Sequence, residues 1–363
     1  MSDTSLRPRV GLAFSGGGFR ATAYGLGALR ALHDRGVLPD VQVVSGISGG
    51  SLLTAMWAYG PADFQAFDAS VTELLQRSLQ AELGRRTFTP RRTAKSIASL
   101  SAAMAPSRSP RRSTRTEALV DALASRDFGA RDITEVTHPG LNTIISATDL
   151  STGNAVRFGS EVSSCSSLGV ITDAVPVADA VAASAAFPVL LPSLNRTYTF
   201  RRADGVEHTK TVLMTDGGVY DNLGVTPLLP GRSRRFTSHV YDLDYIVVVD
   251  AGPGRSAPRA PNFMLGRLKR SFEIAHNRNQ DGSRARVHEL AAAGLIEGVV
   301  YSYLGMRDDR LPVRIADLVP REAVAGYPTN FAKLNDGDLQ AITTRAEQLT
   351  RTLIDYYCPD LGQ

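Results

Sequence analysis

Apolar runs and glycine turns alternate along the first sixty residues of the chain. Residues 10–14 and 41–45 are short, apolar-rich runs of the kind that form buried parallel strands. Each run leads through a glycine-rich turn into a stretch whose apolar residues recur at helical spacing. Gly36 and Pro39 end the first of these stretches. Because the strand–turn–helix unit occurs twice, the pattern predicts an α/β fold with a parallel sheet and helices on its faces.

The same alternation returns in the second half of the chain. Strands are expected at residues 141–147, 211–214, 245–249 and 299–304, and helices at residues 262–292 and 340–357. The 363 residues are 43% hydrophobic and 21% charged, which is the composition of a globular protein. We expect a single domain over residues 1–363, in which residues 262–363 form a mainly helical C-terminal portion on the same core.

Nothing in the sequence predicts a membrane span, a secretory leader or a disulfide framework. No apolar run approaches the ~18 residues that a membrane-spanning helix needs. Residues 1–9 are polar and lack the apolar core of a signal peptide. The two cysteines, Cys165 and Cys358, match no metal-ligand spacing. We therefore expect a soluble protein in a reducing compartment, the cytoplasm.

The charge of the chain is unevenly distributed. There are 40 lysines and arginines against 36 acids, a net charge of +4, but nine of the basic residues lie within residues 85–115, where there is no acid. They are Arg85, Arg86, Arg91, Arg92, Lys95, Arg108, Arg111, Arg112 and Arg115. The rest of the chain carries 31 basic and 36 acidic residues, a net charge of −5.

This basic segment is also rich in proline and serine, and we expect a mobile insertion or lid. Contact with an anionic membrane surface is one interpretation, since each basic residue near such a surface is worth about 1 kcal/mol. A solvated basic loop is the other. Nucleic-acid binding is not expected, because Phe88 is the one aromatic residue among these arginines and offers no stacking platform.

The clearest chemical motif is Gly46-Ile47-Ser48-Gly49-Gly50, a G-x-S-x-G turn between an expected strand and an expected helix. The flanking glycines Gly46 and Gly50 permit a sharp turn that presents the Ser48 hydroxyl, and the following helix directs free N–H groups at it. Ser48 is therefore the candidate nucleophile. A glycine turn with an incidental serine is the alternative.

A second glycine turn, Gly16-Gly17-Gly18 followed by Arg20, opens the first expected helix. Its backbone N–H groups can hold the oxyanion that forms when a serine attacks an ester. The run through Ala21 also matches the dinucleotide fingerprint G-x-G-x-x-G/A. That interpretation requires an acid at the end of the next strand, where this chain has Ser45-Gly46, so we disfavour it.

The serine also needs a base. Asp216, followed by Gly217 and Gly218, lies at the end of an expected strand, and strand ends are where α/β sheets gather their active sites. Asp250 fits the same description. None of the six histidines lies in a recognisable motif, so a histidine base is left open by the residues alone.

These motifs, together with residues 147–153 and 183–188, resemble the patatin-like phospholipase family in kind and in order. Residues 15–21 and 216–224 also resemble cytosolic phospholipase A2. The resemblance fades beyond about residue 260 and does not include residues 85–115.

The resemblance implies a role for each motif. Ser48 would be the nucleophile and Asp216 the base of a Ser–Asp dyad, while Gly16, Gly17 and Gly18 would form the oxyanion loop with Arg20 as its basic residue. Asp149 and Ser184 match motif positions to which we assign structural roles. The implied fold has three layers, with a mostly parallel central sheet between helices on both faces.

The implied activity is that of a lipid acyl hydrolase of phospholipase A or lysophospholipase type. Its partners would be a phospholipid or other lipid acyl ester and a peripheral anionic membrane surface, and it would need no metal or other cofactor. The sequence names no regulator. A Ser-His-Asp α/β-hydrolase esterase is the main alternative, ahead of a non-catalytic lipid-binding module or a dinucleotide-binding domain.

Overall fold

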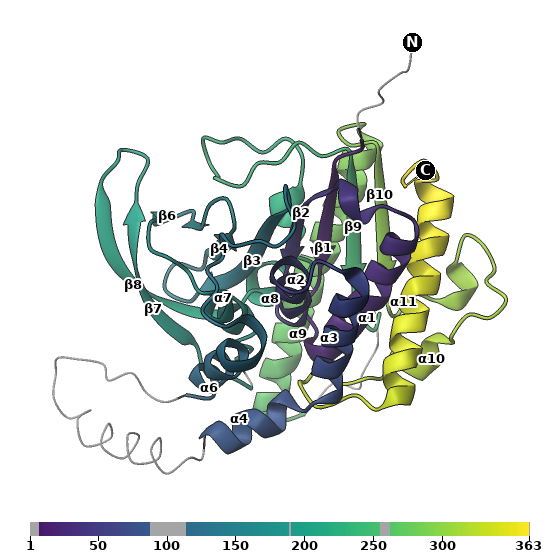
Figure 1. Ribbon diagram of the computed structural model, residues 1–363, viewed down its shortest axis with the longest axis horizontal. Coiled ribbons are helices and arrows are strands. Elements are labelled where there is room, and N and C mark those ends of the chain that lie inside the picture. The colour runs from purple at the N-terminus through teal and green to yellow at the C-terminus, as the bar shows by residue number, and fades with distance from the viewer. Residues whose placement is uncertain (1–6, 88–113, 189, 255–261, 363) are drawn as a thin grey trace.

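The computed structural model describes residues 7–87, 114–188, 190–254 and 262–362 (Figure 1). Its helices are α1 (Gly18–Asp34), α2 (Gly49–Tyr59), α3 (Phe64–Gln76), α4 (Leu79–Thr87), α6 (Arg115–Leu123), α7 (Val177–Ser184), α8 (Gly218–Asp221), α9 (Met264–Ala292), α10 (Arg321–Val324) and α11 (Asp336–Tyr357). Its strands are β1 (Val10–Phe14), β2 (Val41–Gly46), β3 (Asn142–Asp149), β4 (Ala155–Gly159), β5 (Ser164–Cys165), β6 (Gly169–Ile171), β7 (Leu194–Arg201), β8 (Glu207–Asp216), β9 (Tyr245–Asp250) and β10 (Gly298–Tyr303). Single helical turns occur at Leu38–Asp40, Ala124–Phe128, Thr226–Leu228 and Asp308–Arg310.

Five strands form the parallel half of one sheet, in the order β10-β9-β1-β2-β3. The strands expected from the sequence at residues 10–14, 41–45, 141–147, 245–249 and 299–304 all lie here. Since the five strands run in one direction, their carboxyl ends meet at one edge of the sheet. Both glycine turns of the sequence analysis lie at this edge, after β1 and after β2.

The other half of the sheet corrects our expectation of a mostly parallel sheet. From β3 onward the order is β4-β5-β6-β7-β8, every pairing is antiparallel, and β8 pairs again with β3 to close a ring of six strands. The physical reason is chain length. Parallel neighbours need a crossover of a dozen or more residues, whereas only five residues separate Asp149 at the end of β3 from Ala155 at the start of β4.

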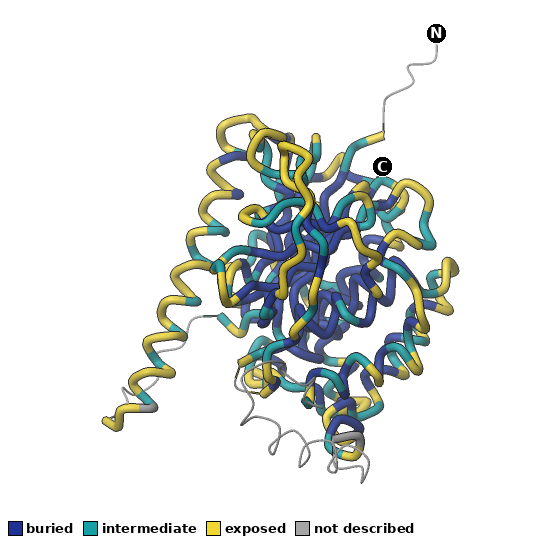
Figure 2. Tube along the Cα trace, turned by 90° about the vertical axis from the view of Figure 1, so that its left-hand side faces the viewer, coloured by how far each residue is buried: buried dark blue, intermediate teal, exposed yellow. Residues whose placement is uncertain are grey.

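The parallel half is buried on both faces. Alternate side chains of the central strands enter two separate apolar clusters, with Leu12 and Val247 on one face and Ala13 and Val248 on the other. The first cluster packs against α1, α2 and α11, and the second against the last turns of α9 and the segment after α8. Figure 2 shows these buried segments at the centre of the molecule. The expected layering of helices on both faces is therefore present in this half.

The C-terminal helix completes the first of these layers. α11 packs along α1, and the contact is so close at Gly27 that a Cβ there would collide with the Thr343 carbonyl oxygen. Buried hydroxyls of Tyr24, Ser302 and Thr350 link α1, β10 and α11 by hydrogen bonds of 2.8 and 3.1 Å. Because one apolar cluster extends from Val10 to Leu361, we propose that the described residues form a single domain.

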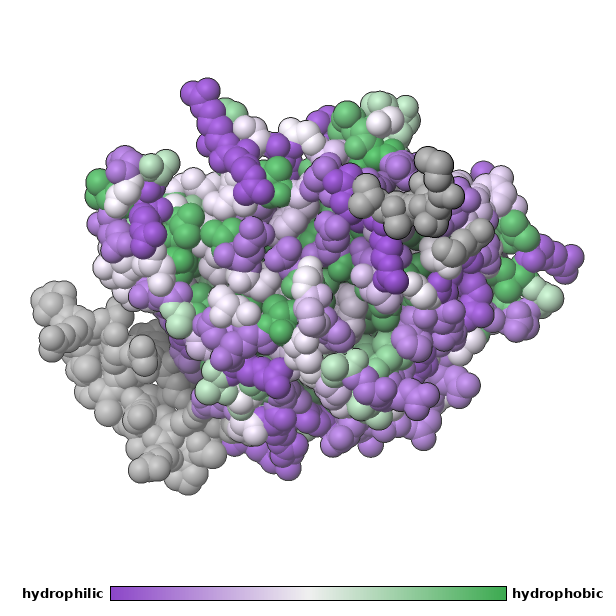
Figure 3. All heavy atoms as spheres, turned by 45° about the horizontal axis from the view of Figure 1, so that its top comes forward, coloured by the Kyte–Doolittle hydropathy of each residue, from purple (hydrophilic) through white to green (hydrophobic). Residues whose placement is uncertain are grey.

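The surface of the molecule is mostly polar. Hydrophilic residues dominate the face seen in Figure 3, and apolar residues occur there in small groups among them. None of the helices in the described ranges has both the length and the apolar character needed to cross a bilayer.

Arg345 of α11 is the largest fully buried side chain, and its environment generates a stability prediction. It donates hydrogen bonds to the carbonyl oxygens of Leu304, Met306 and Val319 at 2.5 to 2.9 Å and pairs with Asp308 at 2.9 Å. Arg345→Met would remove the donor from the buried Leu304 carbonyl and from the partly buried carbonyls of Met306 and Val319, and a buried acceptor without a donor costs about 1–3 kcal/mol. We expect urea denaturation to show a loss of about 3 kcal/mol or more in the free energy of unfolding.

Arg351→Met is the matched control on the same helix. Arg351 is half exposed and pairs at the surface with Asp34 at 3.0 Å, an interaction worth about 0–1 kcal/mol. Equal losses of unfolding free energy in the two variants would contradict the stabilising role that we assign to the buried Arg345.

Candidate active site

Ser48 lies in the turn between β2 and α2 in a strained backbone conformation. Its φ of 52° and ψ of −119° make it the one non-glycine residue with positive φ in the described part of the chain. Such a conformation costs about 1–3 kcal/mol and persists only where the surroundings enforce it. Here they do, because a Cβ at Gly50 would lie 2.5 Å from the Phe14 carbonyl oxygen, and one at Gly49 would collide with the Gly18 carbonyl. The turn has the sharp geometry that the G-x-S-x-G motif predicts.

Asp216 ends β8, and the sheet brings it to the serine. β4 pairs along one side of β3, and on the other side Gly46 of β2 pairs with Ile145 and Asp216 of β8 pairs with Ala147. A strand rises about 3.4 Å per residue, so the two pairing positions, two residues apart on β3, lie about 7 Å apart along the strand. Their side chains lie close enough for the Ser48 hydroxyl to oppose the rise that burial causes in the pKa of the Asp216 carboxyl. Far apart in sequence, the two residues are therefore direct neighbours.

The carboxyl group of Asp216 is strongly affected by burial. The residue is 4% exposed, and burial raises its pKa to about 6, while hydrogen bonds from the Gly218 N–H, at 2.7 Å, and from Ser48 partly offset the rise. No ion pair to Asp216 occurs within the described ranges. A carboxyl group with this pKa exchanges protons near neutral pH, which suits a general base.

Ser184, at the end of α7, links the two motifs. Its Oγ accepts the Ser48 N–H at 2.9 Å, and its carbonyl oxygen accepts the Gly217 N–H at 3.2 Å. Ser184 is fully buried, so these bonds are shielded from water. These two hydrogen bonds are the contacts through which Ser184 would fill the structural role that we assigned to it. Asp149 likewise organises a turn, since its carboxylate accepts the N–H groups of Thr152 and Leu213 at 3.0 and 3.1 Å.

The glycine loop after β1 lies beside the serine. A Cβ on Gly16 would be 3.4 Å from the Ser48 Cβ. The Gly16 N–H is already donated to the Asn222 carbonyl at 3.0 Å, whereas the N–H groups of Gly17 and Gly18 have no acceptor among the described residues. Gly17 and Gly18 have positive φ values of 150° and 58°. The free donors next to Ser48 are therefore those of Gly17 and Gly18.

A late segment of the chain clamps this loop. Phe19 donates its N–H to the Asn330 carbonyl at 2.8 Å, and its ring packs edge-on against Phe331 at 5.5 Å. Arg20 is buried and donates to the Tyr327 carbonyl at 2.5 Å, and burial lowers its pKa. Sequence reasoning missed these contacts because residues 327–331 carry no motif. Arg20 therefore supports the shape of the loop.

Asp250, the other candidate base, belongs to a different network. Its carboxylate accepts hydrogen bonds from the Gly252 N–H at 2.8 Å, the Gln280 amide at 3.0 Å and the Tyr301 hydroxyl at 2.7 Å. Both of its oxygens are thus occupied. The carboxyl group that meets Ser48 is that of Asp216.

One histidine comes near the site. Burial lowers the pKa of His276, on α9, and the nearby Gly218 backbone partly offsets this change. The other five histidines have contacts elsewhere. His33 contacts Asp34 and Phe64, His138 contacts Trp57, His208 contacts Phe200, His239 contacts Ser164, and His288 contacts Tyr301. In the described part of the chain, no histidine hydrogen-bonds to Ser48 or Asp216.

The basic segment falls mostly outside the described residues, since residues 88–113 are not described. At its borders, Arg85 near the end of α4 and Arg115 at the start of α6 are exposed. Its expected mobility and membrane contact stay predictions.

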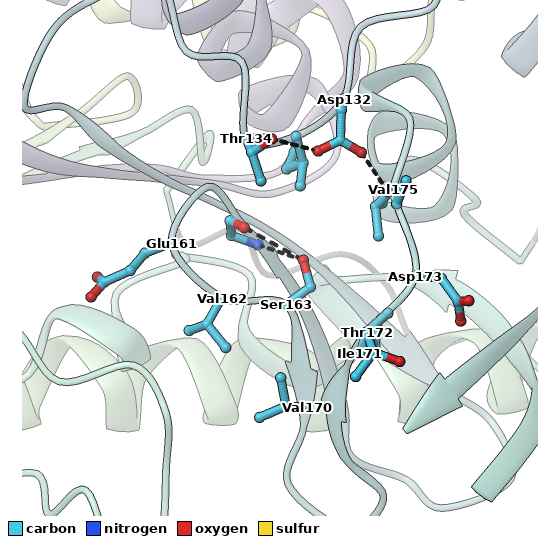
Figure 4. Close-up of a pocket in the computed structure, with 13 residues that line it drawn as sticks. Asp132, Thr134, Glu161, Val162, Ser163, Val170, Ile171, Thr172, Asp173 and Val175 are labelled. Atoms are coloured by element: carbon cyan, nitrogen blue, oxygen red, sulfur yellow. Dashed lines mark hydrogen bonds between the residues drawn. The ribbon is translucent and has the colours of Figure 1, made fainter. Parts of the chain in front are cut away.

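A cavity of about 270 Å³ lies away from Ser48 and Asp216, between the closed ring and the turn that holds Asp132 (Figure 4). The Asp132 carboxylate is used within the turn, accepting from Thr134 and from the Val175 N–H at 2.7 Å. None of the candidate site residues lines this cavity.

This chain resembles known proteins in sequence and in fold. The family model for patatin-like phospholipases matches residues 12–229, more than half of the chain. A probable lysophospholipase 3 of Schizosaccharomyces pombe is 46% identical over 54 residues, which cover 13% of this chain and only 8% of that protein. Human GIVD cytosolic phospholipase A2 has a similar fold, with a TM-score of 0.54 at 14% identity over 97% of this chain and 60% of that one. The matched residues 12–229 contain the glycine loop, Ser48 and Asp216, and this chain belongs to the patatin-like phospholipase family.

Proposed function

We propose that this protein is a serine-dependent lipid acyl hydrolase that cleaves fatty acyl esters of glycerophospholipids. The observation that carries the proposal is the contact between the strained Ser48 and the buried Asp216 carboxylate. Membership of the patatin-like phospholipase family supports a phospholipid or lysophospholipid as the substrate class.

In the first step, Ser48 Oγ attacks the ester carbonyl carbon while Asp216 takes the hydroxyl proton. A serine hydroxyl is a weak nucleophile, so a base in hydrogen-bond contact is required. The pKa of about 6 makes Asp216 a stronger base than an ordinary carboxylate, yet leaves it mostly ionised at pH 7. The strained turn holds Oγ beside the carboxylate before substrate arrives.

The tetrahedral oxyanion would be held by the N–H groups of Gly17 and Gly18, which are the free donors of the glycine loop. Collapse of the intermediate breaks the ester bond, and the leaving alcohol takes the proton from Asp216. Water then attacks the acyl-enzyme with Asp216 again as base, which releases the fatty acid and restores Ser48. This sequence uses no histidine and no cofactor.

We also propose a cytoplasmic location and an anionic membrane surface as partner, with residues 85–115 as one contact. The two cysteines, Cys165 and Cys358, are free thiols, which suits a reducing compartment. The excess of basic residues in residues 85–115 suits an anionic surface.

The proposal predicts a specific set of activities for point variants. Ser48→Ala should reduce hydrolysis of a soluble short-chain ester and of phosphatidylcholine to the uncatalysed background. Asp216→Asn should lower kcat about 10²–10⁴-fold, the usual contribution of a general base. Steady-state kinetics with mass spectrometry of the lipid products measures both.

His276→Gln is the control for a histidine base, because His276 is the histidine nearest the site. Its kcat should stay within a few-fold of wild type. Near-normal turnover in Asp216→Asn, or a loss in His276→Gln as large as in Ser48→Ala, would reject the dyad.

The raised pKa predicts the pH dependence of the reaction. Asp216 must be ionised to accept a proton, so kcat/KM on a soluble ester should fall about tenfold per pH unit below pH 6 and level off above it. A pH–rate profile between pH 4.5 and 8 tests this. A profile that is flat across pH 6 would remove Asp216 as the base.

The same pKa predicts an effect on stability. The carboxyl group titrates at about 6 in the folded protein and at an ordinary 3.8 when unfolded, so the folded state binds more protons between these values. This stabilisation is complete below pH 3.8 and is lost as the pH rises through 6, by up to about 3 kcal/mol. Asp216→Asn removes the titration, so its free energy of unfolding relative to wild type should increase between pH 4 and pH 7. Urea denaturation at both pH values tests this, and a constant difference would contradict it.

A further inference from the structure

The first half of α9 extends beyond the body of the protein at the active-site end. α9 has 29 residues and so is about 43 Å long, whereas the six-residue strands β9 and β10 that flank it span about 20 Å. Its last turns are anchored by the buried Val287 and Leu290. Figure 2 shows α9 as the long helix on the left, with its lower, N-terminal end standing clear of the body.

Contacts midway along α9 fix where the overhang begins. Asn279 donates to the Tyr220 carbonyl at 2.7 Å, and Gln280 donates to Asp250 at 3.0 Å. Tyr220 and Asp250 lie at the edge where the parallel strands end and where Asp216 meets Ser48. His276 also lies beside the edge, at Gly218, and Met264 comes twelve residues before it, so the helix extends about 18 Å past the active-site edge.

The overhang exposes large apolar side chains along one face. Met264, Leu268 and Phe272 are spaced four residues apart, and their exposed fractions are 73%, 65% and 42%. Residues at this spacing form a single stripe along a helix, which we call the α9 apolar stripe. Exposing three large apolar side chains side by side is unfavourable in water, and such a surface is typical of a site that a binding partner covers.

Basic residues border the stripe. Arg267, Lys269 and Arg270 lie between its members, and residues 263–278 carry four basic residues and one acid, a net charge of +3. The acid, Glu273, pairs with Arg270 at 3.3 Å and Lys269 at 3.9 Å. Apolar side chains flanked by cations are the combination that binds the interface of an anionic bilayer.

We propose that the first half of α9 is a membrane-docking helix that inserts the α9 apolar stripe into an anionic lipid surface. The inference rests on the proposed function, for which it names the surface that presents the lipid to Ser48. A second copy of the chain is a poorer occupant, because two stripes facing each other would bring two +3 helices together. A bilayer supplies both the apolar depth and the opposite charge.

The binding experiment uses full-length protein carrying Ser48→Ala, so that the vesicles stay intact. Met264→Ser/Leu268→Ser/Phe272→Ser should weaken cosedimentation with phosphatidylcholine vesicles containing 30% phosphatidylglycerol by at least tenfold. Arg267→Gln/Lys269→Gln/Arg270→Gln should weaken binding to the same vesicles by roughly fivefold per charge at low salt, with little effect on pure phosphatidylcholine.

Phe236→Ser/Val313→Ser/Tyr357→Ser is the matched control, since these apolar residues are also exposed, at 76%, 49% and 56%, and lie outside α9. Its binding should equal that of the parent. Unchanged binding in the stripe variant, or equal losses in stripe and control variants, would overturn the proposal. So would a change from dimer to monomer in the stripe variant, by light scattering, with vesicle binding retained.

Kinetics with Ser48 intact separates this inference from the proposed function. The stripe variant should hydrolyse vesicular phospholipid at least tenfold more slowly and a soluble short-chain ester at the wild-type rate. Equal losses on both substrates would overturn the docking role. If wild type and Ser48→Ala were equally active, the proposed function would fail, while the vesicle-binding comparison would still decide the docking helix.

Discussion

The site depends on one constraint, which is that a strained serine turn and a buried carboxylate must meet along one side of a shared strand. β3 pairs with β2 through Ile145 and with β8 through Ala147, and because β4 pairs along its other side, the two motifs lie next to each other on the same side of this strand. Ser184 then joins them, accepting from Ser48 with its hydroxyl and from Gly217 with its carbonyl. Both arrangements are unfavourable in isolation, because one strains the backbone and the other buries an acid without a cation. The surrounding fold supplies the free energy that holds them together.

This constraint explains why the sheet has two halves. The parallel half gathers the ends of β1 and β2, and with them the glycine loop and Ser48, at one edge. The antiparallel half leaves β3 on the side of β4 and returns to it on the side of β2, where it delivers Asp216. The mostly parallel sheet that we expected has no closed ring to bring β8 back to β3 beside the serine turn. The closed ring is therefore part of how the site is assembled.

Much of the site could be predicted because its signals are local. The Ser48 turn, the Gly16–Gly18 loop and Asp216 each lie within a few residues of a recognisable strand end. Contacts between distant residues could not be predicted. Nothing near Asn222, Tyr327 or Asn330 indicates that their carbonyl groups fasten the glycine loop, and β5 and β6 are too short to show a strand pattern. The helix at residues 262–292 was expected from its periodicity, but its overhang depends on the lengths of the strands beside it.

The α9 overhang and the site together suggest how a buried serine is supplied with lipid. Ser48 is 7% exposed, and the α9 apolar stripe ends at Phe272, about two turns before Asn279 and Gln280 contact the active-site edge. In this account, docking of α9 brings the edge of the parallel sheet to the bilayer, and the charge of the flanking residues selects an anionic surface.

Covalent labelling tests the central claim most directly, because it reports on the nucleophile and its base without any assumption about the natural lipid. The intact protein would be treated with a small alkyl fluorophosphonate, and the modified peptide identified by mass spectrometry at several pH values. The account predicts a single adduct on Ser48, formed at a rate that rises through pH 6 and falls at least a hundredfold in Asp216→Asn. An adduct on Ser45 or Ser51, or an unchanged rate in Asp216→Asn, would contradict it.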